Sequence, residues 1–395
     1  MKILYIVPTT PFPPTYGAQL RELAIGRLLR KCGKVTLVFM ADDDPAQALE
    51  LARADFDDVV ALARVESPAR HGIAPRLAGA AKKLWPGYFG QTLHPDQLAR
   101  FRRALPRHDV AWYHTLMATD WLGVRSMRRA VVDMDDLMHC KFAMDAALER
   151  GRRRLRARWW AVKWRRREMT VLRKFGVICA CSDADKRILG GHDRIHVVPN
   201  GFDLPEREPV WQPRTARRLG FIGPLCYEPN YDAVAWFRDA IWPLVVRDVP
   251  DARLRVVGKL PEDRPPLDHP GFDLLGYVND PAGEIATWSA MVVPLRIGVG
   301  TRIKIIEAFS RKCPVISTSI GAYGNEAEHG RHLLLADRPD EFARACVRLL
   351  QRPDSAAPMA EEAWRLFVSR YTWDSIGGRV EAALDDCLRQ PLCCR

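Results

Sequence analysis

The most informative segment of the chain spans residues 294–309 and reads PLRIGVGTRIKIIEAF. An apolar strand ends at Pro294, a loop containing Gly298 and Gly300 follows, and a helical pattern begins near Thr301. A strand, a glycine loop and a helix in this order form the unit that α/β proteins with parallel sheets repeat. The segment therefore predicts an α/β fold.

The same segment carries chemistry. A helix amino terminus offers unpaired N–H groups and about half a positive charge, and glycines at 298 and 300 let a phosphate approach the backbone. Lys304 lies in the first turn, where a cation is unfavourable for the helix itself, so we infer an anionic partner. Glu307 follows on the same face and can accept hydrogen bonds from a ribose diol. These features predict a nucleotide-diphosphate site.

A simpler interpretation is a capped helix with a surface ladder of Lys304, Glu307 and Arg311. Each pair of such a ladder contributes only roughly 0.2–0.5 kcal/mol. Spacing alone does not separate the two interpretations.

Strand and helix patterns alternate along the whole chain, which is typical of doubly wound parallel sheets. Predicted strands span residues 2–7, 34–40, 58–64, 110–114, 130–133, 177–181 and 196–198, and then 218–223, 253–258, 272–277, 291–294, 314–318 and 332–335. Predicted helices include residues 19–31, 137–148, 231–247, 301–312, 339–351, 359–369 and 373–388.

The strand series is interrupted once, which predicts two Rossmann-like domains. The proline-rich stretch 204–216 is the predicted linker between a first domain, 1–203, and a second domain, 217–372. We expect the last helix, within 373–395, to pack back toward the first domain. Ligands bind at the carboxyl ends of such strands, so a cleft between the two domains is the expected site.

Composition sets further limits. With 395 residues, 48% apolar and 27% charged, the chain is neither disordered nor fibrous. No apolar run approaches the ~18–20 residues that span a bilayer, and the first strand is too short for a signal peptide. Ten cysteines without zinc-finger spacing, among them Cys179 and Cys181 on one strand face, favour core packing. We therefore predict a reducing, cytoplasmic compartment.

The positive charge is concentrated in one helix-like segment, residues 150–175. Between Arg150 and Lys174 there are twelve Arg and Lys and one acid, so this stretch carries +11 of the formal +12. Helical spacing gives it two apolar faces, one with Trp159 and one with Trp164, and only one of them can pack on a domain. An anionic membrane surface is the favoured partner, a solvated helix is the alternative, and nucleic acid is disfavoured because no nucleic-acid motif accompanies the patch.

The first domain offers fewer candidates. Gly17 opens a helix after a proline-rich loop, and the G-x-G-x-x-G pattern is absent there, which argues against a nicotinamide-dependent dehydrogenase. Asp133, followed by Asp135 and Asp136, ends a predicted strand and can supply an acceptor-side base, although helix capping is the simpler account for the cluster. His114, at another strand end, is a second catalytic candidate or a structural histidine.

Several motifs in a fixed order carry a resemblance to a known family. They are VPNGFD (198–203), FIG (221–223) leading to PNYDA (229–233), VVG (256–258), the 294–309 segment with PVIST (314–318), and YTWD (371–374). In this order they resemble GT-B glycosyltransferases of family 4, also called glycosyl transferases group 1, which include sugar transferases of exopolysaccharide systems. The resemblance is strong in the second domain and looser in the first.

This resemblance implies a nucleotide-sugar donor on the second domain, an acceptor on the first, transfer without a metal or cofactor, and retention of anomeric configuration. Carried over by position, Glu307 holds the ribose, Tyr277 lies near the base, and Gly17 approaches the diphosphate from the opposite wall. Backbone groups of Gly300 and Thr301 hold the diphosphate, and Gly298 and Gly223 are further donor-binding residues.

Two departures from the family pattern concern charge. Val299 stands at the position where many members of the family have a glutamate near the reacting carbon of the sugar. Pro224 and Asn230 lie in the region where many members have an arginine and a lysine that neutralise phosphate. Lys304 and Arg302 are the nearest predicted substitutes that could stabilise the leaving diphosphate, and Lys259 is a third candidate.

We therefore predict a glycosyltransferase acting on a hydroxyl acceptor, which can be lipid-linked, in the synthesis of a cell-surface polysaccharide or glycolipid at the inner face of the membrane. The alternative is a non-catalytic scaffold or polyanion-binding protein with the same fold.

Overall fold

The computed structural model describes residues 1–14, 17–41, 45–66, 91–93, 95–209, 211 and 217–391. The chain divides into two compact units, one of Met1–Pro199 with Ile376–Arg395 and one of Asn200–Ser375. The predicted boundary at 203 thus falls four residues inside the second unit. Of the predicted linker, residues 210 and 212–216 lie outside the described residues.

The first unit is built on an eight-stranded sheet in the order β4-β3-β2-β1-β5-β6-β7-β8. All neighbours pair in parallel except β3 with β4, which are antiparallel. The central strands are continuous apolar runs because helices cover both faces of such a sheet. The strands are β1 (Lys2–Val7), β2 (Lys34–Ala41), β3 (Asp58–Glu66), β4 (Gln91–Leu93), β5 (Val110–His114), β6 (Met127–Asp133), β7 (Phe175–Ala180) and β8 (Ile195–Val197).

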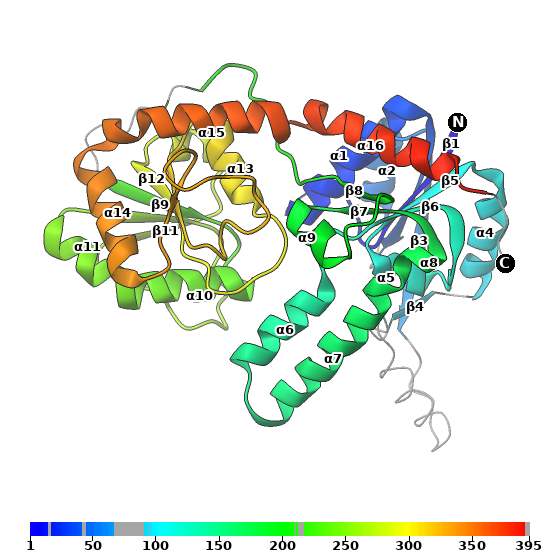
Figure 1. Cartoon of the computed structure of the whole chain (residues 1–395), viewed down its shortest axis with the longest axis horizontal. Helices are drawn as coiled ribbons and strands as arrows, with labels where there is room; N and C mark the ends of the chain where they lie inside the picture. The colour runs from blue at the N-terminus through cyan, green and yellow to red at the C-terminus, as the bar shows by residue number, and fades with distance from the viewer. Residues whose placement is uncertain are drawn as a thin grey trace. The chain divides into compact units, whose positions relative to one another are not determined.

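The helices of the first unit pack around this sheet, and α6 and α7 form a pair that extends from it (Figure 1). These helices are α1 (Gly17–Cys32), α2 (Ala46–Asp55), α4 (Pro95–Ala104), α5 (Leu116–Trp121), α6 (Met138–Leu148), α7 (Gly151–Met169), α8 (Val171–Lys174) and α9 (Asp183–Ile188). The last helix, α16 (Trp373–Leu388), contacts this unit from Ile376 onward, where Arg379 donates to the carbonyl of Val197 at 3.4 Å.

The second unit contains a six-stranded parallel sheet in the order β11-β10-β9-β12-β13-β14. Its strands are β9 (Arg218–Ile222), β10 (Arg253–Val257), β11 (Phe272–Gly276), β12 (Ala290–Val293), β13 (Val315–Ser317) and β14 (Leu334–Leu335). Its helices are α10 (Glu228–Trp236), α11 (Trp242–Asp248), α12 (Pro281–Ile285), α13 (Ile303–Ser310), α14 (Pro339–Gln351) and α15 (Ala357–Arg370). The predicted α/β class with two doubly wound, Rossmann-like domains is confirmed.

One predicted helix is interrupted. The pattern over 231–247 predicts a single helix, but a π-helical turn at Phe237–Ile241 separates α10 from α11. Pro243 lies just after this turn, and a proline has no N–H to continue the regular hydrogen-bond ladder.

Each sheet has one point where the strand order reverses, and such a point opens a crevice at the carboxyl ends of the strands. In the first unit it lies between β1 and β5, and in the second between β9 and β12. The loop that follows β12 contains the segment that predicted the nucleotide site. The fold therefore places that segment where parallel sheets bind ligands.

Candidate functional site

The second unit's crevice is formed by the loop between β12 and α13. Gly298 and Gly300 adopt positive φ angles of 130° and 76°, which an L-residue rarely adopts. The side chain of Arg302 folds back over this loop and donates to the carbonyl of Val299. Arg302 also precedes the first residue of α13, which has no side-chain cap. The N–H group of Ile305 donates to the carbonyl of Arg302 at 3.0 Å, so within the described residues the N–H groups of Ile303 and Lys304 are left for another acceptor.

Lys304 is the charged group of this crevice. Its ammonium donates to Asn230 Oδ1 at 2.8 Å and lies 4.0 Å from the centre of the Phe221 ring. A Cβ built on Gly223 would be 3.0 Å from Lys304 Nζ, so a side chain at position 223 would crowd the ammonium. Within the described residues no carboxylate comes within 4.0 Å of Lys304. Burial, with a smaller effect from Arg302, lowers the pKa of Lys304 well below its ordinary value.

Lys304 is half-buried, and a cation that is partly desolvated without a carboxylate partner is costly, so an anionic ligand would offset that cost. The surface beside Lys304 is formed by backbone atoms, because the backbones of Gly223 and Gly258 are in contact. A Cβ on Gly258 would lie 2.0 Å from the Gly223 carbonyl oxygen, so no side chain fits there. The crevice thus combines a desolvated ammonium, open helix N–H groups and a glycine floor.

Glu307 lies one turn further along α13. Burial raises its pKa to about 7, although Arg311 and Lys304 act in the opposite direction. In the part of the chain that the structure describes, no ion pair within 4.0 Å joins Glu307 to Lys304 or Arg311. The alternative of a capped helix with a surface ladder is therefore wrong, because the cap and the ladder are both missing.

The remaining predicted residues of the second unit take different positions. Thr301 is buried, and its Oγ1 accepts a hydrogen bond from Asn200 at 2.7 Å, so its side chain anchors the loop. Lys259 follows β10 and is exposed. Tyr277 follows the edge strand β11 and is 85% exposed. No described contact joins Lys259 or Tyr277 to Lys304, and their roles stay predictions.

In the first unit, Asp133 ends β6 and is fully buried. Arg21 of α1 donates to both of its oxygens at 2.9 and 3.0 Å, and to the carbonyl of Val198. Burial alone would raise the pKa of Asp133, but Arg21 and His114 lower it to about 2. A buried carboxylate that holds its proton so weakly is a poor base, and the structure favours a structural role for Asp133.

The favoured account of the aspartate cluster as a helix cap is also wrong. The residue before α6 is Leu137, whose side chain makes no capping bond, and the N–H group of His139 in the first turn donates to Glu168 Oε1 at 3.4 Å. Asp133 is used for the pair with Arg21 instead, and Asp135 lies 3.7 Å from the Arg21 Nε atom. Long-range pairing has replaced the local contact that the spacing suggested.

His114 lies in the same buried network. Its ring nitrogens are 3.6 Å from Asp133 Oδ2 and 3.8 Å from Glu22 Oε1. Burial lowers the pKa of His114, but the neighbouring carboxylates reverse this and raise it. Burial raises the pKa of Glu22 to about 7. The predicted catalytic roles of His114 and Asp133 stay predictions, and neither side chain is more than 1% exposed.

The sequence analysis missed Arg21 and Glu22, which lie on the buried face of α1. A signal for them exists, because they interrupt the apolar stripe of the helix that begins at Gly17. Gly17 itself is half-buried at the first residue of α1, as predicted from the sequence. Within the described residues no three His, Cys, Asp or Glu side chains are grouped so as to hold a metal ion.

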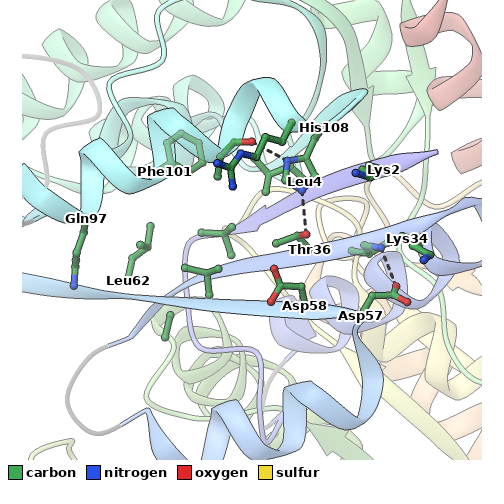
Figure 2. A pocket seen from close by; sticks show the side chains of 16 residues that line it. Lys2, Leu4, Lys34, Thr36, Asp57, Asp58, Leu62, Gln97, Phe101 and His108 are labelled. Carbon is green, nitrogen blue, oxygen red and sulfur yellow. Dashed lines mark hydrogen bonds between the residues drawn. The ribbon is translucent and has the colours of Figure 1, made fainter.

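A separate cavity of about 760 Å³ lies over one face of β1, β2 and β3 (Figure 2). Its rim carries Lys2, Lys34 and Asp57, and His108 bonds Thr36 Oγ1 across it at 3.0 Å. These residues lie toward the amino ends of the strands. The cavity therefore lies toward the amino ends of these strands of the first unit, and not at their carboxyl ends.

The single helix predicted over residues 150–175 is divided in the structure, because α7 ends at Met169, α8 follows from Val171, and Phe175 already begins β7. Helix α7 has two different faces. Trp164 is buried against the sheet, and Trp160 stacks on Phe142 of α6 with ring centres 5.9 Å apart. On the other side Leu155 is 65% exposed and Val162 is 53% exposed. The prediction that one apolar face packs on the domain and the other does not is confirmed. No helix among the described residues is long and apolar enough to cross a membrane.

Residues 216–352, which lie in the second unit, match the family model described as Glycosyl transferases group 1. Among curated proteins, an "Uncharacterized 44.6 kDa protein in cps region" of Klebsiella pneumoniae is 22% identical over 207 residues, 48% of this chain and 53% of the relative. The chain thus spans about half the length of that relative.

Solved structures match nearly the whole chain. HepE of Anabaena, in complex with UDP and glucose, has a TM-score of 0.63 at 16% identity, covering 98% of this chain and 99% of that chain. Sucrose-phosphate synthase of Thermosynechococcus elongatus has a TM-score of 0.67 at 14% identity, covering 97% and 98%. At such identities the likeness shows the fold.

These findings confirm the predicted resemblance to group 1 glycosyltransferases and the two-domain α/β fold of GT-B proteins. The matched segment runs from just before β9 to just after α14, and so includes the crevice with Lys304 and Glu307.

Proposed function

We propose that the chain is a glycosyltransferase that moves a sugar from a nucleotide-diphosphate donor to an acceptor hydroxyl. The observation that carries this proposal is the Lys304 ammonium, which is desolvated without a carboxylate partner beside the uncapped start of α13. The position of this crevice inside the segment that matches group 1 glycosyltransferases supports it.

In this proposal the diphosphate occupies the crevice. The N–H groups at Gly300, Thr301 and the start of α13 donate to the phosphate oxygens, and Lys304 supplies the charge. Glu307 accepts hydrogen bonds from the ribose hydroxyls in its ionised form. Tyr277, exposed after β11, is free to lie against the base.

The chemical role of Lys304 follows from charge. When the bond between sugar and phosphate breaks, negative charge grows on the leaving diphosphate, and a preorganised cation stabilises that charge. We further propose transfer without a metal and with retention of configuration, as the family resemblance implies. Val299 is a departure from the family pattern that bears on this point, because a buried aliphatic side chain stands where many members of the family have a carboxylate.

Neighbouring structures support a nucleotide donor, because HepE was solved with UDP and with UDP-glucose. Calorimetry of the full chain against UDP, GDP and ADP tests the proposal. We expect one nucleotide to bind, and we expect Glu307→Ala to weaken that binding while Asp340→Ala, on exposed α14, leaves it unchanged.

The alternative is a non-catalytic scaffold with the same fold. A chain that binds none of the three nucleotides, or whose Glu307→Ala variant binds them as well as the parent, would favour the scaffold. Transfer of radiolabelled sugar to an acceptor by the parent chain would exclude it.

We also propose that the exposed face of α7 docks on an anionic membrane, which would bring a lipid-linked acceptor to the first unit at the inner face. Leu155 and Val162 are exposed among arginines for which the described residues offer no ion-pair partner, such as Arg152, Arg156 and Arg166. Anionic headgroups attract each basic residue near the surface by roughly 1 kcal/mol. An apolar stripe flanked by cations fits the interface of a bilayer.

Co-sedimentation with vesicles tests this surface. We expect binding to phosphatidylglycerol vesicles that weakens with salt, little binding to phosphatidylcholine, and a clear loss in a variant with Arg152, Arg156 and Arg166 changed to Gln. A matched triple change of Arg344, Arg348 and Arg352 in the second unit should have little effect. Equal binding to both lipids, or equal loss in both variants, would contradict the proposal.

A further inference from the structure

Helices α6 and α7 hold a cluster that the proposed transfer does not use. His139 bonds Glu168 Oε2 through its Nδ1 atom, and its Nε2 atom lies 3.4 Å from the sulfur of Cys140. The three side chains thus form a continuous chain of thiol, imidazole and carboxylate. This is the arrangement in which an imidazole activates a nucleophile while a carboxylate holds its ring.

The burial of the three groups differs in a consistent way. Glu168 is 1% exposed on the inner side of α7, so it fixes the orientation of the ring. Cys140 is half-buried. Hydrogen bonds that the His139 ring donates to Cys140 and Glu168 raise the pKa of His139 to about 9, and the imidazole keeps its proton at neutral pH.

Cys140 lies in the first turn of α6, whose start is already occupied. The N–H group of His139 donates to Glu168 Oε1 at 3.4 Å, and that of Cys140 donates to the carbonyl of Leu137 at 3.0 Å. The sulfur of Cys140 is therefore influenced by the His139 ring, which Glu168 holds in place. An adjacent imidazolium activates a cysteine toward electrophiles.

We propose that Cys140 is a modification site that reacts with hydroperoxides. The thiolate sulfur attacks the terminal peroxide oxygen, an S–O bond forms and the O–O bond breaks. The leaving hydroxide or alkoxide takes the proton from His139 Nε2. The cysteine is oxidised by two electrons to the sulfenic acid and the peroxide is reduced by two. This inference is independent of the proposed glycosyl transfer.

The test uses the full chain, hydrogen peroxide and dimedone, which traps sulfenic acid, followed by peptide mass spectrometry. Cys226 is an internal reference because it is exposed whereas Cys140 is only half-buried. We expect Cys140 to be trapped at least about tenfold faster than Cys226. If exposure alone sets the rate, Cys226 is trapped first or both react equally, and the proposal is overturned.

Two variants separate activation from packing. His139→Gln and Glu168→Gln should each slow the trapping of Cys140 severalfold and leave Cys226 unchanged. A structural role, in which the His139 and Glu168 pair only holds α6 against α7, predicts no specific slowing and would overturn the inference. If a variant fails to fold, as judged by circular dichroism, the comparison of the two cysteines in the parent chain still decides.

Discussion

Replacement of Lys304 by methionine tests the anion site most directly, because it should change stability and ligand binding in opposite directions. In the free chain the ammonium is desolvated and gains only the amide of Asn230 and the ring of Phe221. Methionine has a similar length and keeps the apolar contact. The variant loses one hydrogen bond, worth about 0.5–1.5 kcal/mol. It also removes an unpaired charge whose desolvation costs several kcal/mol in the parent chain.

The expected balance is a free energy of unfolding that is unchanged or higher by ~1 kcal/mol, a rise of ~2–4 °C in Tm for a unit of this size. Nucleotide binding should suffer, because a hydrogen bond to a charged group contributes about 1.5–3 kcal/mol. That corresponds to roughly 10–150-fold weaker binding.

Thermal denaturation of the free variant and calorimetry against UDP give the two quantities. Arg344→Met is the matched control, because Arg344 is an exposed cation of α14 paired with Asp340 at 3.0 Å. The control should change neither quantity appreciably. A Lys304→Met variant that is clearly less stable and still binds nucleotide normally would refute the assignment of Lys304 as the anion partner.

Three further changes test other parts of the molecule. Because burial raises the pKa of Glu307 to about 7, its carboxyl becomes protonated as the pH falls from 8 to 6. Nucleotide affinity should fall over that interval by up to about tenfold per pH unit, and Glu307→Gln should bind weakly with no such dependence. Arg21→Met leaves the buried carboxylate of Asp133 without its arginine partner and should lower the free energy of unfolding by about 3–5 kcal/mol in denaturant titration. Adding Asp133→Asn should recover part of this loss. A loss below ~1 kcal/mol would contradict the importance of the pair. Gly223→Ala places a Cβ 2.7 Å from an amide nitrogen at a φ of 146°, so both stability and nucleotide affinity should drop, whereas Gly330→Ala, with a φ of 78° and no atom within 4 Å, should lower stability alone.

Local sequence was sufficient wherever one segment contains its own signal. The predicted bounds of β1, β5, α14 and α16 agree with the structure to the residue, because buried strands are continuous apolar runs and surface helices have a period of 3.6. The crevice also belongs to this class. Its loop, helix start and cation lie within the sixteen residues 294–309, so neighbouring positions in the chain remain neighbours in space.

Partners distant in the chain could not be predicted in this way. The cluster of Asp133, Asp135 and Asp136 was interpreted as a helix cap because the nearest helix was visible in the sequence, whereas the actual partner of Asp133 is Arg21, 112 residues away. Asn200, which anchors Thr301, is 101 residues from it. Periodicity reports which face of an element is buried, but it contains no information on which buried groups meet.

The sequence by itself therefore determined the α/β class, the two sheets, the glycine loop with Lys304 and Glu307, and the two-faced basic helix. Contacts between distant segments were needed to show that Lys304 has no carboxylate within 4.0 Å among the described residues, that Asp133 is a buried ion-pair partner, and that His139 joins Cys140 to Glu168. The physical reason is that the protonation and reactivity of a charged group depend on its desolvation and on its neighbours within a few ångströms. Both are set by packing between segments that are far apart in the chain.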